Sequence, residues 1–598
     1  MVMNMNKKKI FLSTIIMIIE LFLYYYIFIK NKVIEFDNTS NIINVSIIIL
    51  NSYLITIVSN IKYKIKEMPI LYFISLVIAF FVCGKKLFLT EGVISISLKS
   101  LLLFFLISIL LLPFINNILS FIENTNIKEV ASLSKKKQNS WKFFILIFMI
   151  FFGIWTIVGL SFFPGNLTSD STSQFAQAMG LIQIDNAHPA FGTIIIRWLL
   201  KIWKNPFVVL LAYITYFSII LAYIYRYLYE QNVNKVILIC TAILFAISCN
   251  NLSLMTMIWK DIPFTISLLW LTFELYKISK EGTTYFNNNW SIVKIFTALL
   301  FTYFFRHNGL VVYLTAIVYL IFLAYKSKSK RIIFTIIISA FSIWFIKNPV
   351  YNYYKVDSSN IMSSGTASFA AKGLGALVYY QGSLTKEEQK QIEKIADLED
   401  LKKYYSPYSI DTYSFQNIGW DDGIKELGVN TIYQLYIENA LETPTIIIRD
   451  RLDSCDLLWD YTTPKDGFNY KYDIGIAYPK FIKEFKGYKK NSGIKYIPPE
   501  NELMSIVTEY QEYTGKVVSL DILYWRPALI LSIFLLLLIV IIRNRMKIFP
   551  CVFPTFISII FWALLMSHQS YRYLWFLPVN VFFIFLLTML EKQERVFK

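Results

Sequence analysis

The sequence predicts an all-α polytopic membrane protein with roughly 14 transmembrane helices and one large extracytoplasmic domain of mixed or mainly α structure. Three observations predict this class. The 598-residue chain is 56% hydrophobic and 17% aromatic, with a mean hydropathy of +0.51. Apolar runs such as 93–115, 143–163 and 527–542 approach or exceed the length that crosses a ~30 Å hydrocarbon core. One polar stretch, 347–526, is long enough for a domain of its own.

Four regions follow from the order of these runs along the chain. Residues 1–142 hold the N-terminal spans and a basic cytoplasmic loop, and residues 143–346 hold the membrane core with an acidic outer loop at 164–205. The extracytoplasmic domain covers residues 347–526, and the C-terminal spans cover residues 527–598. The first span follows Met-Asn-Lys-Lys-Lys without a small-residue cleavage site, so we expect it to be retained. The expected spans are centred near residues 20, 51, 77, 104, 153, 216, 243, 269, 299, 317, 339, 535, 558 and 582.

The net charge of +18 does not indicate a nucleic-acid protein. Residues 347–526 hold 21 Lys and Arg against 25 Asp and Glu, so the positive excess lies outside the one large polar segment. It lies mainly in short loops between apolar runs, where basic residues orient a membrane protein. We therefore expect no nucleic-acid partner.

Basic residues also predict which side each loop faces. If the N-terminus is cytoplasmic and the spans alternate, the inner loops and both termini hold 26 basic residues and the outer short loops hold 10. This asymmetry orients both termini to the cytoplasm and the 347–526 domain to the outside. The chain has only three histidines, and all of them (His188, His307 and His568) fall in junctions expected on the outer face.

The outer loop 164–205 begins with Phe-Phe-Pro-Gly and continues with polar residues, among them Asp170, Asp185 and His188. A carboxylate at the membrane surface can act as a general base. The alternative for Asp170 is an N-cap, because SDSTSQFAQAMG is typical of a helix start. The stretch 191–204 predicts an amphipathic helix in the membrane interface.

Three further junctions carry charges at span ends. They are Lys260-Asp261 in WKDIPF, Arg306-His307 in FRHNG, and Arg572-Tyr573 in SHQSYRY. Guanidinium groups at a span end suit a lipid phosphate, because their contacts to oxygen anions are bidentate. The competing interpretations are helix capping for Asp261, headgroup snorkelling for the cations and an interfacial belt for the tyrosines.

Other chemistries lack their sequence signatures. The chain contains no Walker loop, no HExxH, no GxSxG and no dinucleotide fingerprint. The acidic stretches 420–422 and 449–460 match no metal-ligand spacing, so we expect them to be solvated helix faces. No cofactor is indicated firmly, and a divalent metal stays an open alternative.

In order and sidedness, the constellation resembles the GT-C superfamily of glycosyltransferases that use polyprenyl-phosphate sugars, such as protein O-mannosyltransferases and bacterial aminoarabinose transferases. The resemblance covers the layout of residues 143–590: an acidic outer loop, the WKD and RHN junctions, a large outer domain and a late RY-P element. It implies that Asp170 is the base, that basic residues hold the donor phosphate, and that the sugar carbon inverts. Here roughly four spans precede the one that leads into the acidic loop, whereas family members commonly place this loop after the first span.

The expected function is transfer of a sugar from a polyprenyl-phosphate donor to an envelope glycan, lipid or protein on the outer face of a bacterial membrane. Nucleotide sugars do not reach that face, so activated sugars there are carried on lipid phosphates. The sites implied are Asp170 or Asp185 as base, and Arg306, His307 and Arg572 at the phosphate, with His188, Lys260, Asp261 and Tyr573 nearby. The alternatives are a polysaccharide polymerase or ligase, and a lipid-glycan flippase. Transporters place charges at the membrane midplane, where we expect only Glu20 and Lys99.

Overall fold

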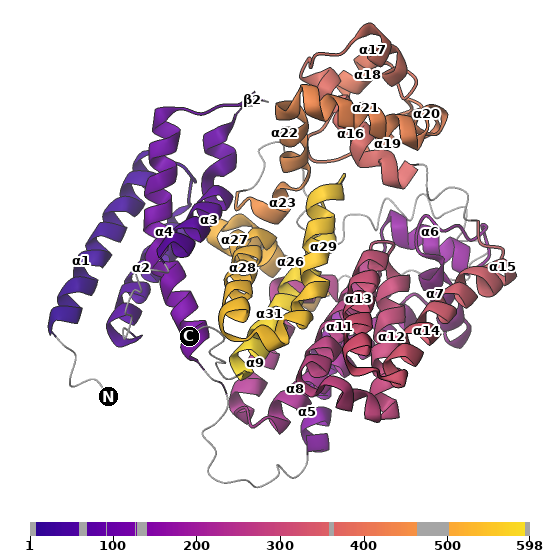
Figure 1. Cartoon of the computed structure of the whole chain (residues 1–598), viewed down its shortest axis with the longest axis horizontal. Helices are drawn as coiled ribbons and strands as arrows, with labels where there is room; N and C mark the ends of the chain where they lie inside the picture. The colour runs from indigo at the N-terminus through magenta and orange to yellow at the C-terminus, as the bar shows by residue number, and fades with distance from the viewer. Residues whose placement is uncertain are drawn as a thin grey trace.

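The computed structural model describes residues 7–58, 68–90, 93–125, 127, 140–357, 364–462 and 501–591. They form an all-α membrane protein, and the described residues include one short two-stranded sheet (Figure 1). Nine helices of this part of the chain are long and apolar enough to cross a membrane. Each of the fourteen expected span centres falls inside a helix, but the number of spans beyond these nine remains a prediction. The inner basic residues that lie outside the described residues are Lys62, Lys64, Lys66, Lys128, Lys135, Lys136, Lys137, Lys592, Arg595 and Lys598.

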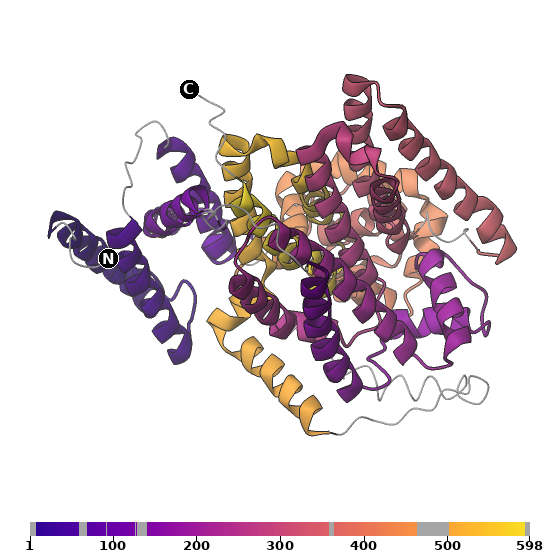
Figure 2. The same ribbon diagram turned by 90° about the horizontal axis from the view of Figure 1, so that it is seen from below.

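The first group of elements comprises the described residues between 7 and 124 and stands to one side of the molecule in Figure 2. Helix α4 packs on α3 and on the C-terminal helix α28, which joins this group to the rest. Its elements are α1 (Lys7–Tyr24), η1 (Tyr25–Lys30), α2 (Asn38–Val58), α3 (Met68–Phe88), β1 (Leu89–Thr90), β2 (Val93–Ile94) and α4 (Leu98–Asn124). Strands β1 and β2 are antiparallel, with Leu89 opposite Ile94.

The second group forms the membrane core and its polar junctions. Its elements are α5 (Ser140–Ser161), α6 (Ser169–Ala178), α7 (Ala190–Ile202), α8 (Phe207–Glu230), α9 (Lys235–Ile247), α10 (Cys249–Leu254), α11 (Asp261–Glu281), η3 (Gly282–Asn287), α12 (Asn289–Phe305), α13 (Gly309–Ser327), α14 (Lys330–Phe345), η4 (Ile346–Val350) and α15 (Tyr351–Tyr353). Helix α7 coincides closely with the expected amphipathic helix, and its Trp198 is exposed.

The third group runs from the polar segment to the end of the described chain. Its elements are α16 (Ser364–Tyr379), α17 (Lys386–Ile392), α18 (Leu398–Lys403), α19 (Asp411–Ser414), α20 (Trp420–Leu427), α21 (Val429–Glu442), α22 (Pro444–Ser454), α23 (Asp456–Trp459), α26 (Glu502–Lys516), α27 (Val518–Trp525), α28 (Pro527–Asn544), η5 (Met546–Val552), α29 (Phe553–Leu565), α30 (Tyr571–Leu574) and α31 (Phe576–Leu590).

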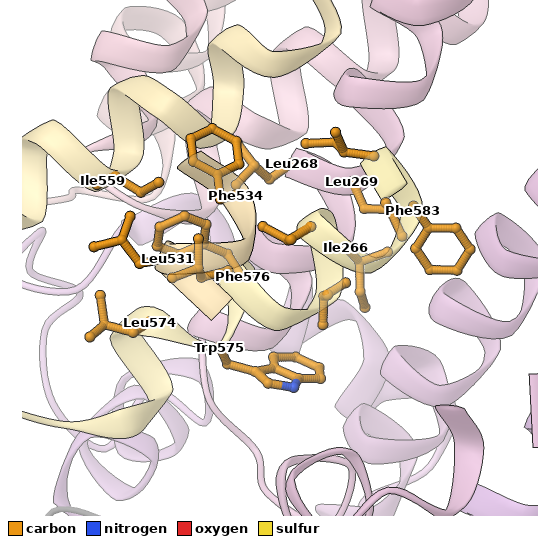
Figure 3. Close-up of a cluster of buried hydrophobic side chains, with 14 of the residues drawn as sticks. Ile266, Leu268, Leu269, Leu531, Phe534, Ile559, Leu574, Trp575, Phe576 and Phe583 are labelled. Carbon is orange, nitrogen blue, oxygen red and sulfur yellow. The ribbon is translucent and has the colours of Figure 1, made fainter. Parts of the chain in front are cut away.

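Helix α11 is the central helix of the core. It packs on α8, α12, α29 and α31, and nearly all of its side chains are buried. A helix that is apolar on all sides is suited to such a position. In Figure 3, Leu268 and Leu269 of α11 lie among Phe534 of α28 and Phe576 and Phe583 of α31. Dispersion contacts of this kind hold helices together where lipid offers no hydrophobic driving force. The start of α11 is thereby fixed in position.

Helices α16 to α22 form a separate small domain above the membrane core (Figure 1). Its own hydrophobic cluster runs from Ala367 to Ile447 and includes the fully buried Tyr413 and Leu374. Residues of α23, α26 and α27 pack in the large core instead. The independently packed part of the expected 347–526 domain is therefore smaller than that segment.

The acidic stretch 449–460 contradicts the expectation of a solvated face. The side chains of Asp450 and Lys372 are both fully buried and form an ion pair, which Tyr405 supplements with a hydrogen bond of 2.8 Å to Asp450. Further along, Asp456 is buried and pairs with Lys85 of α3. A charge survives such burial only when it is paired and hydrogen-bonded. The first pair joins α16 to α22 inside the small domain, and the second holds α23 on α3. In the other acidic stretch, Asp421 and Asp422 are exposed as expected.

Charges inside apolar helices also differ from expectation. Glu20 is buried in α1 and accepts a hydrogen bond of 3.4 Å from Asn51, whereas Lys99 is exposed at the start of α4. Glu274, which the sequence did not single out, is fully buried in α11. Trp270 and Tyr285 donate hydrogen bonds of 3.0 Å and 2.6 Å to its two oxygens. Because both oxygens are satisfied, Glu274 is a structural group in this state.

Candidate active site

The first part of the site is the start of α6, which carries Asp170. Thr168 is the N-cap of this helix and forms a capping box with Ser171, while Asp170 lies in the first turn. The alternative in which Asp170 serves as the cap is therefore wrong, because Thr168 occupies that place. The carboxylate of Asp170 is available for contacts outside its own helix.

A seam of hydrogen bonds fixes α6 beside the start of α11. The amide of Ile258 donates to the carbonyl of Asn166 at 3.1 Å, and the hydroxyl of Ser171 donates to the carbonyl of Ile258 at 2.5 Å. The indole of Trp259 donates to the Thr168 hydroxyl at 2.7 Å. All of these groups are buried, so leaving any of them unpaired would cost free energy. The seam therefore places the acidic loop and the WKD junction next to each other.

Asp170 is held by two cations from distant parts of the chain. Its Oδ2 lies 2.9 Å from Nη2 of Arg572 and 3.6 Å from Nζ of Lys260. Its side chain keeps 23% of its accessible surface, against 10% for Arg572 and 14% for Lys260. The carboxylate of Asp170 is therefore more accessible to solvent than the two cations that hold it.

Asp261 is the second acid of the cluster and is almost completely buried. Its Oδ1 pairs with Nη1 of Arg306, and its Oδ2 lies 3.9 Å from Nε of Arg572. Arg572 therefore stands between the two carboxylates. The junctions before α11, after α12 and before α31 meet at this point. The sequence predicted that these junctions face the same side of the membrane, but not that they touch.

Aromatic rings line the two guanidinium groups. Arg306 lies 5.0 Å from the ring centre of Trp562 and 4.8 Å from that of Tyr573, and these two rings stack with centres 4.8 Å apart. Arg572 lies 4.9 Å from the ring of Trp259 and donates a hydrogen bond of 3.1 Å to the Tyr573 hydroxyl. Cation–π contacts of this kind keep a desolvated cation in place. Trp562, in the middle of an apolar run, gave no sequence signal of this role.

The two loop histidines lie at the edge of the cluster. His188 Nδ1 contacts Nζ of Lys260, and His307 Nε2 donates to the backbone carbonyl of Asn186 at 3.0 Å. His307 therefore fixes the loop that carries His188. A direct role of His307 at the donor phosphate stays a prediction.

The charge state of the cluster follows from burial and mutual contact. Burial raises the pKa of Asp170, but Arg572 and then Lys260 outweigh it and hold this pKa well below its usual range. Burial and the neighbouring Lys260 lower the pKa of His188 to about 3, so His188 is neutral. Burial lowers the pKa of Lys260 to about 8, although Asp170 opposes the shift. Burial lowers the pKa of Arg306 to about 10, which leaves it charged.

Asp185 has a different environment from Asp170. Its Oδ2 accepts a hydrogen bond of 2.9 Å from Gln177, and its Oδ1 accepts one of 3.0 Å from the amide of Ala187. Its backbone pairs with that of Asp357. The structure does not bring Asp185 into the ion pairs of Asp170 and Asp261, and its carboxylate orders the loop instead.

The small domain reaches the site through the segment before α30. Ser409 pairs in antiparallel fashion with His568, and the amide of Gln569 donates to the carbonyl of Tyr408 at 3.1 Å. Nδ1 of His568 lies 2.7 Å from the Ser409 hydroxyl and 3.1 Å from Oδ2 of Asp411. These contacts hold the backbone just ahead of Arg572. Sequence analysis did not reveal this link, because the two segments are far apart along the chain.

The cluster does not suit a divalent metal ion. Among the residues that the structure describes, no group of three or more His, Cys, Asp and Glu side chains could hold one. The two carboxylates of the cluster already face Arg306, Arg572 and Lys260, and these positive charges would repel a second cation.

Three cations and two carboxylates give the cluster a net positive charge at neutral pH. They lie where several helix ends meet, and Asp170 remains partly accessible. This arrangement can bind an anion at its cations and offer a carboxylate to a neighbouring hydroxyl. The molecule is thus a helical membrane protein with an ionic site at the ends of its core helices. No protein-family model, curated protein or solved structure matches the chain.

Proposed function

We propose that the protein is a glycosyltransferase that moves a sugar from a polyprenyl-phosphate donor to an envelope acceptor. One observation carries the proposal: Asp170 is the partly open carboxylate of a buried cluster that also holds Arg572, Lys260 and, through Asp261, Arg306. A transfer between a lipid phosphate and a hydroxyl needs both a base and cations for the leaving group. The cluster supplies these two functions within one site.

The reaction is a single displacement at the anomeric carbon of the donor sugar. The acceptor oxygen forms a bond to this carbon while the bond from the carbon to the phosphate oxygen breaks. The electron pair of the broken bond stays on the phosphate, and the proton of the acceptor hydroxyl goes to the carboxylate of Asp170. Attack from the face opposite the phosphate inverts the configuration of the carbon.

The cations stabilise the charge that develops on the leaving phosphate. The phosphate of the donor carries one negative charge and gains a second when the carbon–oxygen bond breaks. Aromatic rings lie against Arg306 and Arg572 and keep both guanidinium groups in this region of the site, where they can meet this charge. Lys260 is the third cation in reach of the same region.

The proposed location of the site is the outer surface of the cell membrane, with both termini in the cytoplasm. The excess of basic residues in the loops expected inside supports this orientation. Figure 1 supports this location for the acidic loop, because α6 lies on the side of the membrane core that faces the small domain. The donor enters from the bilayer, and the acceptor is a glycan, a lipid or a protein of the envelope that presents its hydroxyl at the outer surface.

A strain that lacks the gene tests this function. We expect one sugar to disappear from an envelope component while its polyprenyl-phosphate form accumulates, both measured by mass spectrometry. Complementation with the wild-type gene should reverse both changes. Accumulation of long lipid-linked chains would indicate a polymerase or ligase instead. Accumulation confined to the inner leaflet would indicate a flippase, and an unchanged glycan and lipid profile would refute the transferase.

A further inference from the structure

The Arg572 guanidinium is shared between two acids, and this sharing bears on how the base works. Nη2 lies 2.9 Å from Asp170, and Nε lies 3.9 Å from Asp261. Asp170 also has Lys260 at 3.6 Å, on the same Oδ2 atom. In this state the carboxylate that should accept a proton is paired with the two cations Arg572 and Lys260.

This pairing makes Asp170 a weak base. Two cations hold its pKa far below the range in which a carboxylate removes a proton from a hydroxyl efficiently. His188, from the loop before α7, also faces Asp170, and it is neutral. Within the described part of the chain, the charged neighbours of Asp170 therefore weaken it as a base.

We propose that Arg572 is a gate on the base, which the donor phosphate opens by drawing the guanidinium away from Asp170. This inference rests on the proposed function. A phosphate competes well with a carboxylate for arginine, because it accepts two parallel hydrogen bonds and carries a full charge. Arg572 has a second acidic partner in Asp261, so it can turn from Asp170 without losing every partner.

The gate has a defined sequence of events. Donor binding frees Asp170, which then accepts the proton of the acceptor hydroxyl as the sugar is transferred. The leaving phosphate has gained a negative charge and holds Arg572 more strongly. When this phosphate departs, Arg572 returns to Asp170, and the restored ion pair expels the proton to solvent. The donor must therefore bind before the acceptor can be activated.

Competition for Arg572 gives a test that does not require the natural donor. The probe is farnesyl phosphate, with farnesol and inorganic phosphate as separate arms, added to the full-length protein in nanodiscs of neutral lipid. If Asp170 competes with the phosphate, Asp170→Asn should lower the Kd for farnesyl phosphate roughly tenfold or more, the scale of one charge-assisted hydrogen bond. Farnesol should bind weakly, and inorganic phosphate should show a smaller affinity but the same relative gain.

A double-mutant cycle separates the gate from a simple change of net charge. In an Arg572→Gln background no guanidinium can be released, so Asp170→Asn should no longer tighten binding. A gain that persists there would overturn the gate but leave the phosphate site intact. Equal or weaker binding by Asp170→Asn in the wild-type background would also overturn it. Should Arg572→Gln fail to fold, Arg572→Lys keeps the charge and removes the fork, and the gain should shrink. No binding of farnesyl phosphate by the wild type would refute the donor site itself, and the gate with it.

Discussion

Replacing Asp170 with Asn tests the proposed base most directly. The side chain keeps its shape and loses its charge and its ability to accept the proton. Thr168 provides the N-cap of α6, so the substitution leaves the cap untouched. Any effect therefore reports on the ion pairs and on the chemistry rather than on the start of the helix.

The expected loss of stability is small because the cations keep other partners. Arg572 retains the hydroxyl of Tyr573 at 3.1 Å and Asp261 at 3.9 Å, and Lys260 retains its contact with His188. One charge-assisted interaction at a partly exposed carboxylate contributes about 1–3 kcal/mol. The protein should therefore fold and insert, with a modest fall in its melting temperature.

The expected loss of activity is much larger. A positioned base typically contributes ~10²–10⁴-fold in rate, so transfer should fall by that factor. The assay follows a labelled sugar from the membrane lipid fraction to the acceptor, normalised to folded protein by gel filtration in detergent. Asp185→Asn is the matched control, because it makes the same chemical change in the same loop and should retain most of the activity. Near-normal transfer by Asp170→Asn would refute the reasoning, and a loss confined to Asp185→Asn would assign the base to Asp185.

Four further outcomes are expected. Arg306→Ala should weaken binding of farnesyl phosphate roughly tenfold or more without unfolding the protein, and unchanged affinity would favour headgroup snorkelling. Affinity for this probe should fall as pH rises through about 8, where Lys260 loses its charge, and Lys260→Arg should remove that transition; the phosphate itself is fully ionised there. Lys372→Met should cost up to about 3–5 kcal/mol, because the buried Asp450 would keep Arg451, 3.5 Å away, in place of its fully buried partner, whereas Lys425→Met in an exposed pair should cost less than about 1 kcal/mol; equal effects on thermal unfolding would contradict this. Cysteine introduced at Ser383 should react with an impermeant reagent on intact cells, and labelling only after permeabilisation would place the small domain inside.

The membrane class and the positions of the span centres could be read from the sequence. Hydropathy is a local and additive property, so a run of about twenty apolar residues predicts a helix without knowledge of its neighbours. For the same reason the ionisable residues at the ends of the runs stood out. Asp170, Lys260, Asp261, Arg306 and Arg572 were singled out in this way, and the structure brings them into one cluster.

Only the tertiary structure decides which residues far apart in the sequence contact each other. The contacts of Asp170 with Arg572 and those of Asp185 with Gln177 distinguish the favoured acid from the alternative that the sequence left open. The cap at Thr168 was likewise hidden, because Ser, Thr and Asp are all common at that position and only the backbone geometry selects one.

The acids of 449–460 are a second case in which contacts between distant residues, and not the local sequence, decide the environment of a side chain. Their composition is that of a solvated helix face, and the sequence interpretation followed composition. Asp450 is buried nonetheless, because Lys372 meets it from a different helix, and Asp456 is buried because Lys85 reaches it from the membrane core. The free energy of burying a charge depends on whether a countercharge is present in space. That information is distributed over residues far apart in the chain, and it becomes available only when the chain folds.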